Sequence, residues 1–301
     1  MLEELLDHDQ SICEHKSLGK LKNNMPPSSS FLHPLLKRVS RSFFLSLRML
    51  PKGVRPTLSL AYLLARASDS IADVATAPEA FRIRLLDGLP SFWPPRPLRE
   101  LGGLTGADRD LLGAMPGLLE MLRSSPDREE IERVWQTIRT GQIFDLERFA
   151  AASNPLTLPE ARRYTGLVAG CVGEFWTDVC LRHIPDFSRE SPETMRRLGF
   201  SFGCGLQWVN ILRDRHHDAK AGRVYVDTEN FSAGLAIARG HLADGARYAA
   251  AVRCRRLRAA SRLPLLLANR TLDLVEAAPD NTRVKVSRWF VWRSLALAVL
   301  R

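Results

Sequence analysis

The sequence lacks the features that mark disulfide-stabilised, zinc-binding, secreted and membrane-spanning proteins. Its 301 residues contain only five scattered cysteines and no C-x-x-C pair, so we expect free thiols in a reducing compartment and no zinc site. No apolar run reaches the roughly 18 residues that a transmembrane helix needs. Residues 1–24 carry charges throughout, without the apolar stretch of a secretory signal. These absences predict a cytoplasmic protein.

Sustained alternation of polar and apolar residues, which indicates a half-buried strand, is also missing, and apolar residues recur instead at helical spacing. No Gly/Ser-rich linker divides the chain. We therefore expect an all-α fold with one domain over residues 31–301, preceded by a poorly ordered polar extension over 1–30. Residues 227–240 are expected to form a loop with a short turn. The expected helices cover residues 31–50, 54–74, 76–89, 108–122, 127–151, 161–181, 193–220, 242–277 and 286–300.

The chain is basic, with 43 lysines and arginines against 33 acidic residues and a formal net charge of +10. Such a charge suits nucleic acid, an anionic membrane surface or a polyanionic ligand. The bases do not share one face with interleaved aromatic residues, so we expect no nucleic-acid partner. Five arginines cluster in the sequence, as a solvated helix face or as a membrane-surface contact: Arg253, Arg255, Arg256, Arg258 and Arg262.

Two pairs of aspartates stand out, Asp69 with Asp73 and Asp214 with Asp218. Residues four apart lie on one face of a helix, where two like charges repel each other. Both pairs sit in largely apolar helical segments, so we expect a cation to compensate them. Further polar residues share the two stripes, namely Tyr62 and Arg66 in the first and Gln207 and Asn210 in the second.

This pattern favours Mg²⁺, which binds through one or two carboxylates together with substrate phosphates. Two facing aspartate stripes would hold several Mg²⁺ ions and clamp a diphosphate, which then becomes a good leaving group. The carbocation left behind needs a dry, apolar and aromatic cavity. Ser40, Arg41 and Ser42 could bind an oxyanion such as phosphate, although a polar helix start is an alternative reading of these residues.

Three glycines recur on one face of the helix expected over 161–181, namely Gly166, Gly170 and Gly173. Each glycine costs about 1 kcal/mol relative to alanine inside a helix, so the stripe is expected to have a purpose. Either another helix or a flat apolar ligand could approach the glycines closely.

Four segments, in this order, resemble the squalene/phytoene synthase family over roughly residues 33–300. Residues 40–43 (S-R-S-F, ending in Phe43) are similar to the family's diphosphate segment, and 62–73 (Y-L-L-A-R-A-S-D-S-I-A-D) to its first aspartate motif. Tyr164 with Val168, Gly170 and Gly173 matches its Y-x-x-x-V-A-G-x-V-G segment. Residues 207–218 and the following Gly222-Arg223-Val224-Tyr225 match its second aspartate motif.

The resemblance implies an isoprenoid synthase fold around one central cavity. It implies head-to-head condensation of two farnesyl diphosphates through presqualene diphosphate, followed by NADPH reduction to squalene. Tyr164 would handle the proton of the first half-reaction, and Phe43, Tyr62, Val168, Gly170, Gln207 and Asn210 would support the cavity. The resemblance assigns Mg²⁺ to Asp69, Asp73, Asp214 and Asp218, and the diphosphates to Ser40, Arg41, Ser42, Arg66, Arg213 and Arg223.

Two positions depart from the family pattern, Ser70, where Asp or Thr is usual, and Asp227, where proline is usual. The chain also lacks the C-terminal membrane helix of eukaryotic squalene synthases, so it resembles the bacterial enzymes, and a peripheral contact with the inner membrane face stays open. Phytoene, dehydrosqualene and presqualene diphosphate remain alternative products. A non-catalytic helical protein at a membrane surface is the alternative from another class. The oligomeric state is not predicted.

Overall fold

The computed structural model describes residues 29–40, 43–74, 76–91, 93, 101–151, 154–278, 282 and 284–300. Over these residues the chain is helical, with one isolated backbone bridge and no sheet, which confirms the expected all-α class. The helices in chain order are α2 (Ser29–Val39), α3 (Phe43–Met49), α4 (Arg55–Ala72), α5 (Glu79–Gly88), α7 (Gly106–Gly113), α8 (Met115–Arg123), α9 (Arg128–Ala151), α10 (Leu158–Thr165), the π-helix η1 (Gly166–Gly170), α11 (Cys171–His183), α12 (Pro192–Lys220), α13 (Phe231–Ala251), α14 (Arg255–Ala277) and α15 (Arg288–Leu300).

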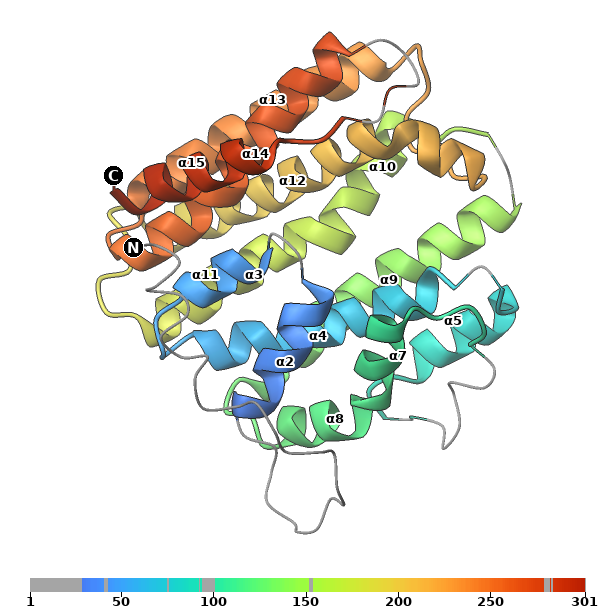
Figure 1. The fold of residues 1–301 in the computed structure, drawn as a ribbon, viewed down its shortest axis with the longest axis horizontal. Helices are drawn as coiled ribbons and strands as arrows, with labels where there is room; N and C mark the ends of the chain where they lie inside the picture. Colours follow the sequence, from blue (N-terminus) through green and yellow to red (C-terminus); the bar gives the residue numbers. More distant parts are fainter. Residues whose placement is uncertain are drawn as a thin grey trace.

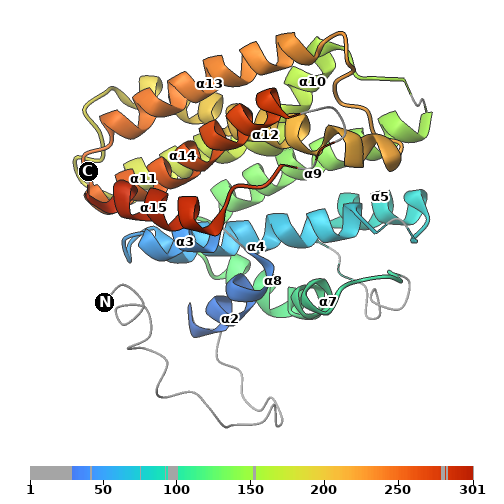
Figure 2. The ribbon, with the colours of Figure 1, turned by 45° about the horizontal axis from the view of Figure 1, so that its top comes forward.

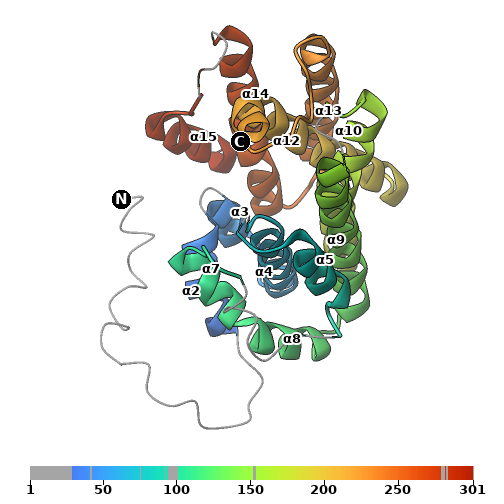
Figure 3. The same cartoon turned by 90° about the vertical axis from the view of Figure 1, so that its right-hand side faces the viewer.

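Helix α4 occupies the middle of one half of the molecule. The shorter helices α2, α5, α7 and α8 gather around it, while α12, α13, α14 and α15 form the other half (Figure 1, Figure 3). Pro56 suits the first turn of α4, because its missing N–H would have no helical partner there. Leu63, Leu64 and Ile71 are fully buried, so the apolar side of α4 forms part of the main core. The expected N-terminal extension lies almost entirely outside the described residues.

Two of the helices expected before residue 125 are each interrupted. The helix expected over 31–50 divides at Ser40, whose Oγ donates to the Leu36 carbonyl at 2.5 Å and so competes with continued helix formation. The helix expected over 108–122 divides at Ala114. Pro116 stands in the first turn of α8, where the lack of an N–H favours a new helix start over continuation of α7.

The prediction for residues 227–277 was wrong in two places. Residues 231–240 belong to α13, although they were expected in a loop, because Gly234 gains tertiary packing against Trp208 and Leu212 that outweighs its poor helix propensity. The single helix expected over 242–277 is broken at residues 252–254. There the backbone pairs outside the helix, since the Arg253 N–H donates to the Phe187 carbonyl.

Two Thr-x-x-Glu sequences, Thr76 with Glu79 and Thr157 with Glu160, each predict a capping box at a helix start, and their outcomes differ. Thr157 and Glu160 form a reciprocal capping box at the start of α10. Thr76 does not cap α5, because its hydroxyl donates to the Gly102 carbonyl at 2.6 Å and Pro78 occupies the N-cap position. The expectation at Thr76 was wrong because residues 101–105 pass close to it, which the local pattern could not show.

The glycine stripe serves helix packing. A Cβ on Gly173 would lie 1.9 Å from the Gly199 carbonyl oxygen of α12, and a Cβ on Gly203 would lie 2.1 Å from the Ala169 carbonyl oxygen. The two backbones therefore meet without intervening side chains. The helix also contains one turn of π-helix at 166–170, a feature that often marks functional sites. The structure supports close approach of another helix at this stripe, and Gly173 also lines the cavity described below.

The described cysteines Cys171, Cys180, Cys204 and Cys254 are free, as expected, and Cys13 lies outside the described residues. Burial raises the pKa of the Cys204 thiol to about 11 and that of Cys171 to about 12. These thiols are therefore protonated and poorly nucleophilic, which fits packing residues.

We expect Gly173→Ala to destabilise the fold by at least about 2 kcal/mol, because the added methyl group overlaps the α12 backbone. The matched control is Gly240→Ala on α13, where an added Cβ would meet nothing within 4 Å. That variant should be neutral or stabilised by up to about 1 kcal/mol. Urea unfolding of both variants measures the difference, and equal stabilities would contradict the close helix contact.

Candidate active site

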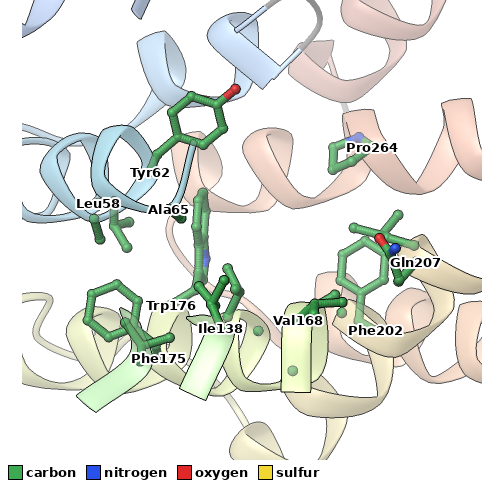
Figure 4. Close-up of a pocket in the computed structure, with 18 of the residues that line it drawn as sticks. Leu58, Tyr62, Ala65, Ile138, Val168, Phe175, Trp176, Phe202, Gln207 and Pro264 are labelled. Atoms are coloured by element: carbon green, nitrogen blue, oxygen red, sulfur yellow. The ribbon is translucent and has the colours of Figure 1, made fainter. Parts of the chain in front are cut away.

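A cavity of about 360 Å³ lies between the two halves of the molecule. Most of its wall is apolar, and Tyr62, Trp176, Phe202 and Gln207 surround the central space (Figure 4). The wall is built from α3, α4, α9, η1, α11, α12, α13 and α14. Asp69, Gln207 and Asn210 bring polar groups to it. The volume and the lining are typical of a site for an apolar small molecule with a polar part.

The first aspartate pair projects from the end of α4. The Gln142 side-chain N–H donates to Asp69 Oδ1 at 2.5 Å. Burial, followed by the charge of Asp73, raises the pKa of Asp69 to about 7. Asp73 is largely exposed and accepts a hydrogen bond from Arg223 at 3.3 Å. Asp69 is therefore a carboxylate that its own surroundings do not stabilise in the charged form.

Arg66 is turned toward a neighbouring helix. Its guanidinium donates to Asp108 Oδ1 of α7 at 2.9 Å, and the Ser70 hydroxyl donates to the same oxygen at 2.8 Å. Hydrogen bonds from Thr105 and Ser70 and the charge of Arg66 together hold the pKa of Asp108 below its usual value, against the effect of burial. The unusual Ser70 thus helps to fix α7 against α4.

The second aspartate pair lies near the end of α12. Arg213 forms a two-point ion pair with Asp214, in which Nε lies 3.0 Å from Oδ1. Burial, followed by the nearby charge of Asp214, raises the pKa of Asp218, while Arg223 opposes this rise. The carboxyl of Asp218 is therefore the less compensated of the two.

Arg223 lies between the two aspartate pairs. Its Nη1 is 3.3 Å from Asp73 Oδ1 on α4 and 3.7 Å from Asp145 Oδ2 on α9, and its charge also acts on Asp218 of α12. The chain turns sharply just before it, at Gly222 with φ of +80°. This left-handed conformation, which glycine adopts without steric cost, directs Arg223 back over the ends of three helices.

Tyr164 belongs to a group of aromatic and acidic side chains beside Arg223. Its ring stacks on Tyr225 with the ring centroids 5.0 Å apart. The Tyr225 hydroxyl lies close enough to the buried Asp145 to favour the charged form of that carboxyl. Burial nevertheless raises the pKa of Asp145 to about 6, and burial raises the pKa values of both tyrosines far above the usual range. Tyr164, Tyr225 and Asp145 therefore form one buried group of titratable side chains.

The predicted S-R-S-F segment is described only in part. Ser40 is buried beside Tyr62, and the two side chains are hydrogen-bonded, while Arg41 and Ser42 lie outside the described residues. Phe43 begins α3, and its side chain is likewise not described. Of these four residues the structure thus places only Ser40 relative to the cavity residue Tyr62.

Among the predicted support residues, Tyr62, Val168, Gln207 and Asn210 line the cavity. Gly170 does not share this position, which corrects the expectation. A Cβ on Gly170 would lie 2.7 Å from the Phe200 ring and 2.8 Å from Cys204 Sγ, so this glycine faces α12.

Sequence reasoning missed four residues that complete the site: Gln142, Asp145, Asp108 and Tyr225. Gln142 and Asp145 stand three apart in α9 and are buried there. Two buried polar side chains on one face of a helix were the available signal, but α9 carries many other charges that obscure it. Tyr225 is part of the Gly222-Arg223-Val224-Tyr225 match to the family motif, but the sequence did not predict a function for it.

The donor set fits Mg²⁺. Gln142 Oε1, Asp145 Oδ1 and Arg223 Nε are buried without a hydrogen-bond partner among the described residues, so this region is built to receive a further polar group. Within the same residues, no three acidic, histidine or cysteine side chains converge closely enough to cage a metal by themselves. Mg²⁺ commonly binds through one or two carboxylates and takes its other ligands from water and phosphate. Asp69, Asp73, Asp214 and Asp218 would hold ions in this manner.

The fold and the site together define an all-α protein with an apolar cavity and two aspartate pairs. The family model for squalene/phytoene synthase matches residues 36–236. The chain belongs to the squalene/phytoene synthase family, which confirms the resemblance that its motifs indicated.

Curated relatives carry names from both branches of this family. A bifunctional lycopene cyclase/phytoene synthase of Colletotrichum graminicola is 30% identical over 203 residues, which cover 64% of this chain and 33% of the relative. The Botryococcus squalene synthase of Botryococcus braunii is 27% identical over 223 residues, which cover 72% of this chain and 47% of the relative. The chain thus spans less than half the length of either relative.

Solved structures share the fold. The structure of TcSQS with a bound ligand has a TM-score of 0.75 at 22% identity, and the match covers 90% of this chain and 86% of that one. The squalene synthase HpnC from Alicyclobacillus acidocaldarius has a TM-score of 0.54 at 18% identity, covering 81% and 93% of the two chains. At these identities the likeness establishes the architecture alone.

We expect the metal-free protein to lose stability as the pH rises from 5 to 8. Folding raises the pKa of Asp69 from 3.8 to about 7, so its contribution is complete below about pH 3.8 and is lost as the pH passes about 7. Solvent screening at this partly exposed carboxyl limits the loss to about 1–2 kcal/mol. Thermal unfolding in EDTA across this range measures it.

Asp69→Asn should flatten that dependence, and Asp273→Asn on the exposed side of α14 is the matched control. Adding Mg²⁺ with inorganic pyrophosphate should raise the Tm of the native protein most at high pH, where Asp69 is charged. A Tm that increases with pH in EDTA would show that Asp69 is compensated by groups of the protein itself.

Proposed function

We propose that this chain catalyses the Mg²⁺-dependent head-to-head condensation of two farnesyl diphosphates through presqualene diphosphate, followed by NADPH reduction to squalene. The observation that carries the proposal is the apolar cavity whose polar wall includes Asp69, with Arg223 linking Asp73 and Asp145 nearby. Such a site can bind a long apolar chain and a diphosphate at once. Family membership supports a prenyl-transferring reaction.

The aspartates and arginines would bind and ionise the diphosphate. When bound, Mg²⁺ would supply positive charge that stabilises the departing diphosphate. Arg223 and Arg213 add positive charge near the two aspartate pairs, and each already faces a carboxylate that the ions would neutralise. We propose that both arginines bind diphosphate once metal ions occupy the aspartates. Arg66 would contribute to a smaller extent, since Asp108 engages its guanidinium.

The apolar wall would exclude water from the carbocation. Phe202, Trp176 and Phe175 present aromatic rings to the cavity, and aromatic faces stabilise cations in the absence of water (Figure 4). Formation of the cyclopropane ring of presqualene diphosphate releases one proton. We propose that the Tyr164 oxygen accepts it while the Tyr164 proton moves to Tyr225 and the Tyr225 proton moves to the Asp145 carboxylate, whose pKa of about 6 leaves it ionised at neutral pH.

The reductive step rests on the likeness to squalene synthases alone. The described residues contain no glycine-rich turn between a strand and a helix, the usual dinucleotide site, and we assign no residue to NADPH. The alternative is a non-reductive member of the family that releases phytoene, dehydrosqualene or presqualene diphosphate. The phytoene synthase name of one relative supports this alternative. We further propose one catalytic domain over residues 31–301 and a cytoplasmic location.

A product assay separates these reactions. The protein should convert farnesyl diphosphate with Mg²⁺ and NADPH to squalene, and should accumulate presqualene diphosphate or dehydrosqualene when NADPH is left out. Preference for a C20 diphosphate would favour phytoene synthesis. Asp69→Asn and Asp214→Asn should each lower kcat at least about 100-fold, since each removes one metal-binding carboxylate, and Asp273→Asn should not. Absence of product from the native protein with either diphosphate would favour a non-catalytic protein, and full activity in both variants would contradict the metal-binding role of the aspartates.

The proton path through Tyr225 can be tested separately. Tyr225→Phe keeps the ring that stacks on Tyr164 but removes the hydroxyl that acts on Asp145. We expect formation of presqualene diphosphate to slow by about 10²–10⁴-fold, the usual contribution of general acid–base catalysis, with little change in KM. Tyr248→Phe is the control for loss of a buried tyrosine hydroxyl, because Tyr248 also lines the cavity but its hydroxyl contacts Thr177 and not Asp145. An unchanged rate in Tyr225→Phe would exclude this path.

A further inference from the structure

Helix α15 exposes an apolar stripe on its outer side. Trp289 is 68% exposed, Trp292 is 47% exposed and Val299 is 50% exposed, and they follow one another at helical spacing along one face. The opposite face packs on α14, where Leu295 and Ala298 contact Ala259 and Leu263. Helix α15 is therefore apolar on both sides although it lies at the edge of the molecule (Figure 1, Figure 3).

Basic residues alone accompany this stripe. From residue 281 to the end of the sequence there is no Asp or Glu. Arg288 and Arg293 are exposed on α15, and Arg293 lies 5.4 Å from the Trp289 ring. On α14, Arg270 lies 5.9 Å from the Phe290 ring. Exposed tryptophans flanked by arginines combine apolar insertion with attraction to anionic groups.

A second copy of the chain is a poor occupant for this surface. In a symmetric dimer the same patch meets itself, so two α15 helices would bring their arginines together without acidic partners. An anionic lipid surface complements both the charge and the apolar stripe. The helix has 13 residues, fewer than the about 20 needed to span a bilayer, so it can lie only in the interface. Among the described residues, no helix combines the length and the apolar character that crossing a membrane requires.

We propose that the outer face of α15, formed by Trp289, Trp292 and Val299 with Arg288 and Arg293, docks the protein on an anionic lipid bilayer. Helix α14, on which α15 packs, also extends to the two cavities inside the protein. Leu263 and Leu267 of α14 contact the α15 cluster and also line a smaller cavity of about 200 Å³, which shares Leu206, Asn210 and Pro264 with the main cavity. Figure 2 shows α15 beside α14, and α14 carries residues that line both cavities. This inference does not depend on the reaction proposed above.

Vesicle flotation of the full-length protein tests the docking surface. The native protein should float with vesicles of phosphatidylcholine containing phosphatidylglycerol, and weakly with phosphatidylcholine alone. Trp289→Ser with Trp292→Ser should weaken partitioning at least about tenfold, since two aromatic side chains lose their apolar contact. Trp289→Phe with Trp292→Phe should restore most of it. Bromine-labelled acyl chains should quench the fluorescence of the native protein and not that of the serine variant.

A charge-matched pair of variants separates this surface from the general basicity of the chain. Arg288→Gln with Arg293→Gln should weaken binding to anionic vesicles by about tenfold. Arg123→Gln with Arg128→Gln removes the same charge from α8 and α9 and should have little effect. Circular dichroism confirms folding of each variant. Absence of flotation by the native protein, equal flotation of the serine variant, or loss of a dimer in that variant on sedimentation would each overturn the proposal.

Discussion

The site depends on carboxylates that the protein holds away from water without enough positive charge of its own. Asp145 is buried near the end of α9 and Asp69 is half-buried near the end of α4, and burial raises both pKa values. Arg223 cannot neutralise them all, since its Nη1 is already shared between Asp73 and Asp145. The structure thus retains an electrostatic cost that a divalent cation would remove, which couples ligand binding to the stability of this end of the bundle.

This arrangement requires the helices to be held at fixed separations. The contact of Gly173 with Gly199 brings α11 against α12 at backbone distance, which places the cavity wall of α11 next to Gln207 and Asn210. On the other side, Asp108 ties α7 to α4 through Arg66 and Ser70. Polar residues near the site therefore have two kinds of role, some for the ligand and others for the position of the helix ends.

The sequence allowed prediction of the helical class and of both aspartate pairs, because a four-residue spacing within an apolar helix is a local property. It did not reveal that α13 includes Gly234, because that outcome depends on packing against Trp208 in α12. It also did not reveal that α13 ends before Val252, because the backbone there pairs with Phe187 in the loop before α12. Asp145 was missed for a similar reason. Its significance lies in its distance from Arg223 and Tyr225, and those residues are about eighty positions away.

Arg66 and Arg223 both belong to the aspartate motifs, but their charges are compensated by different kinds of partner. Arg66 has a partly buried carboxylate partner in Asp108, which lies outside the two aspartate pairs and already compensates much of its charge. Arg223 has only partners that belong to the site, and its Nε lacks a hydrogen-bond partner among the described residues. A diphosphate carried by metal ions would release Arg223 from Asp73 and give its guanidinium a stronger acceptor. Of these two arginines, Arg223 is therefore the one whose interactions must change when substrate binds.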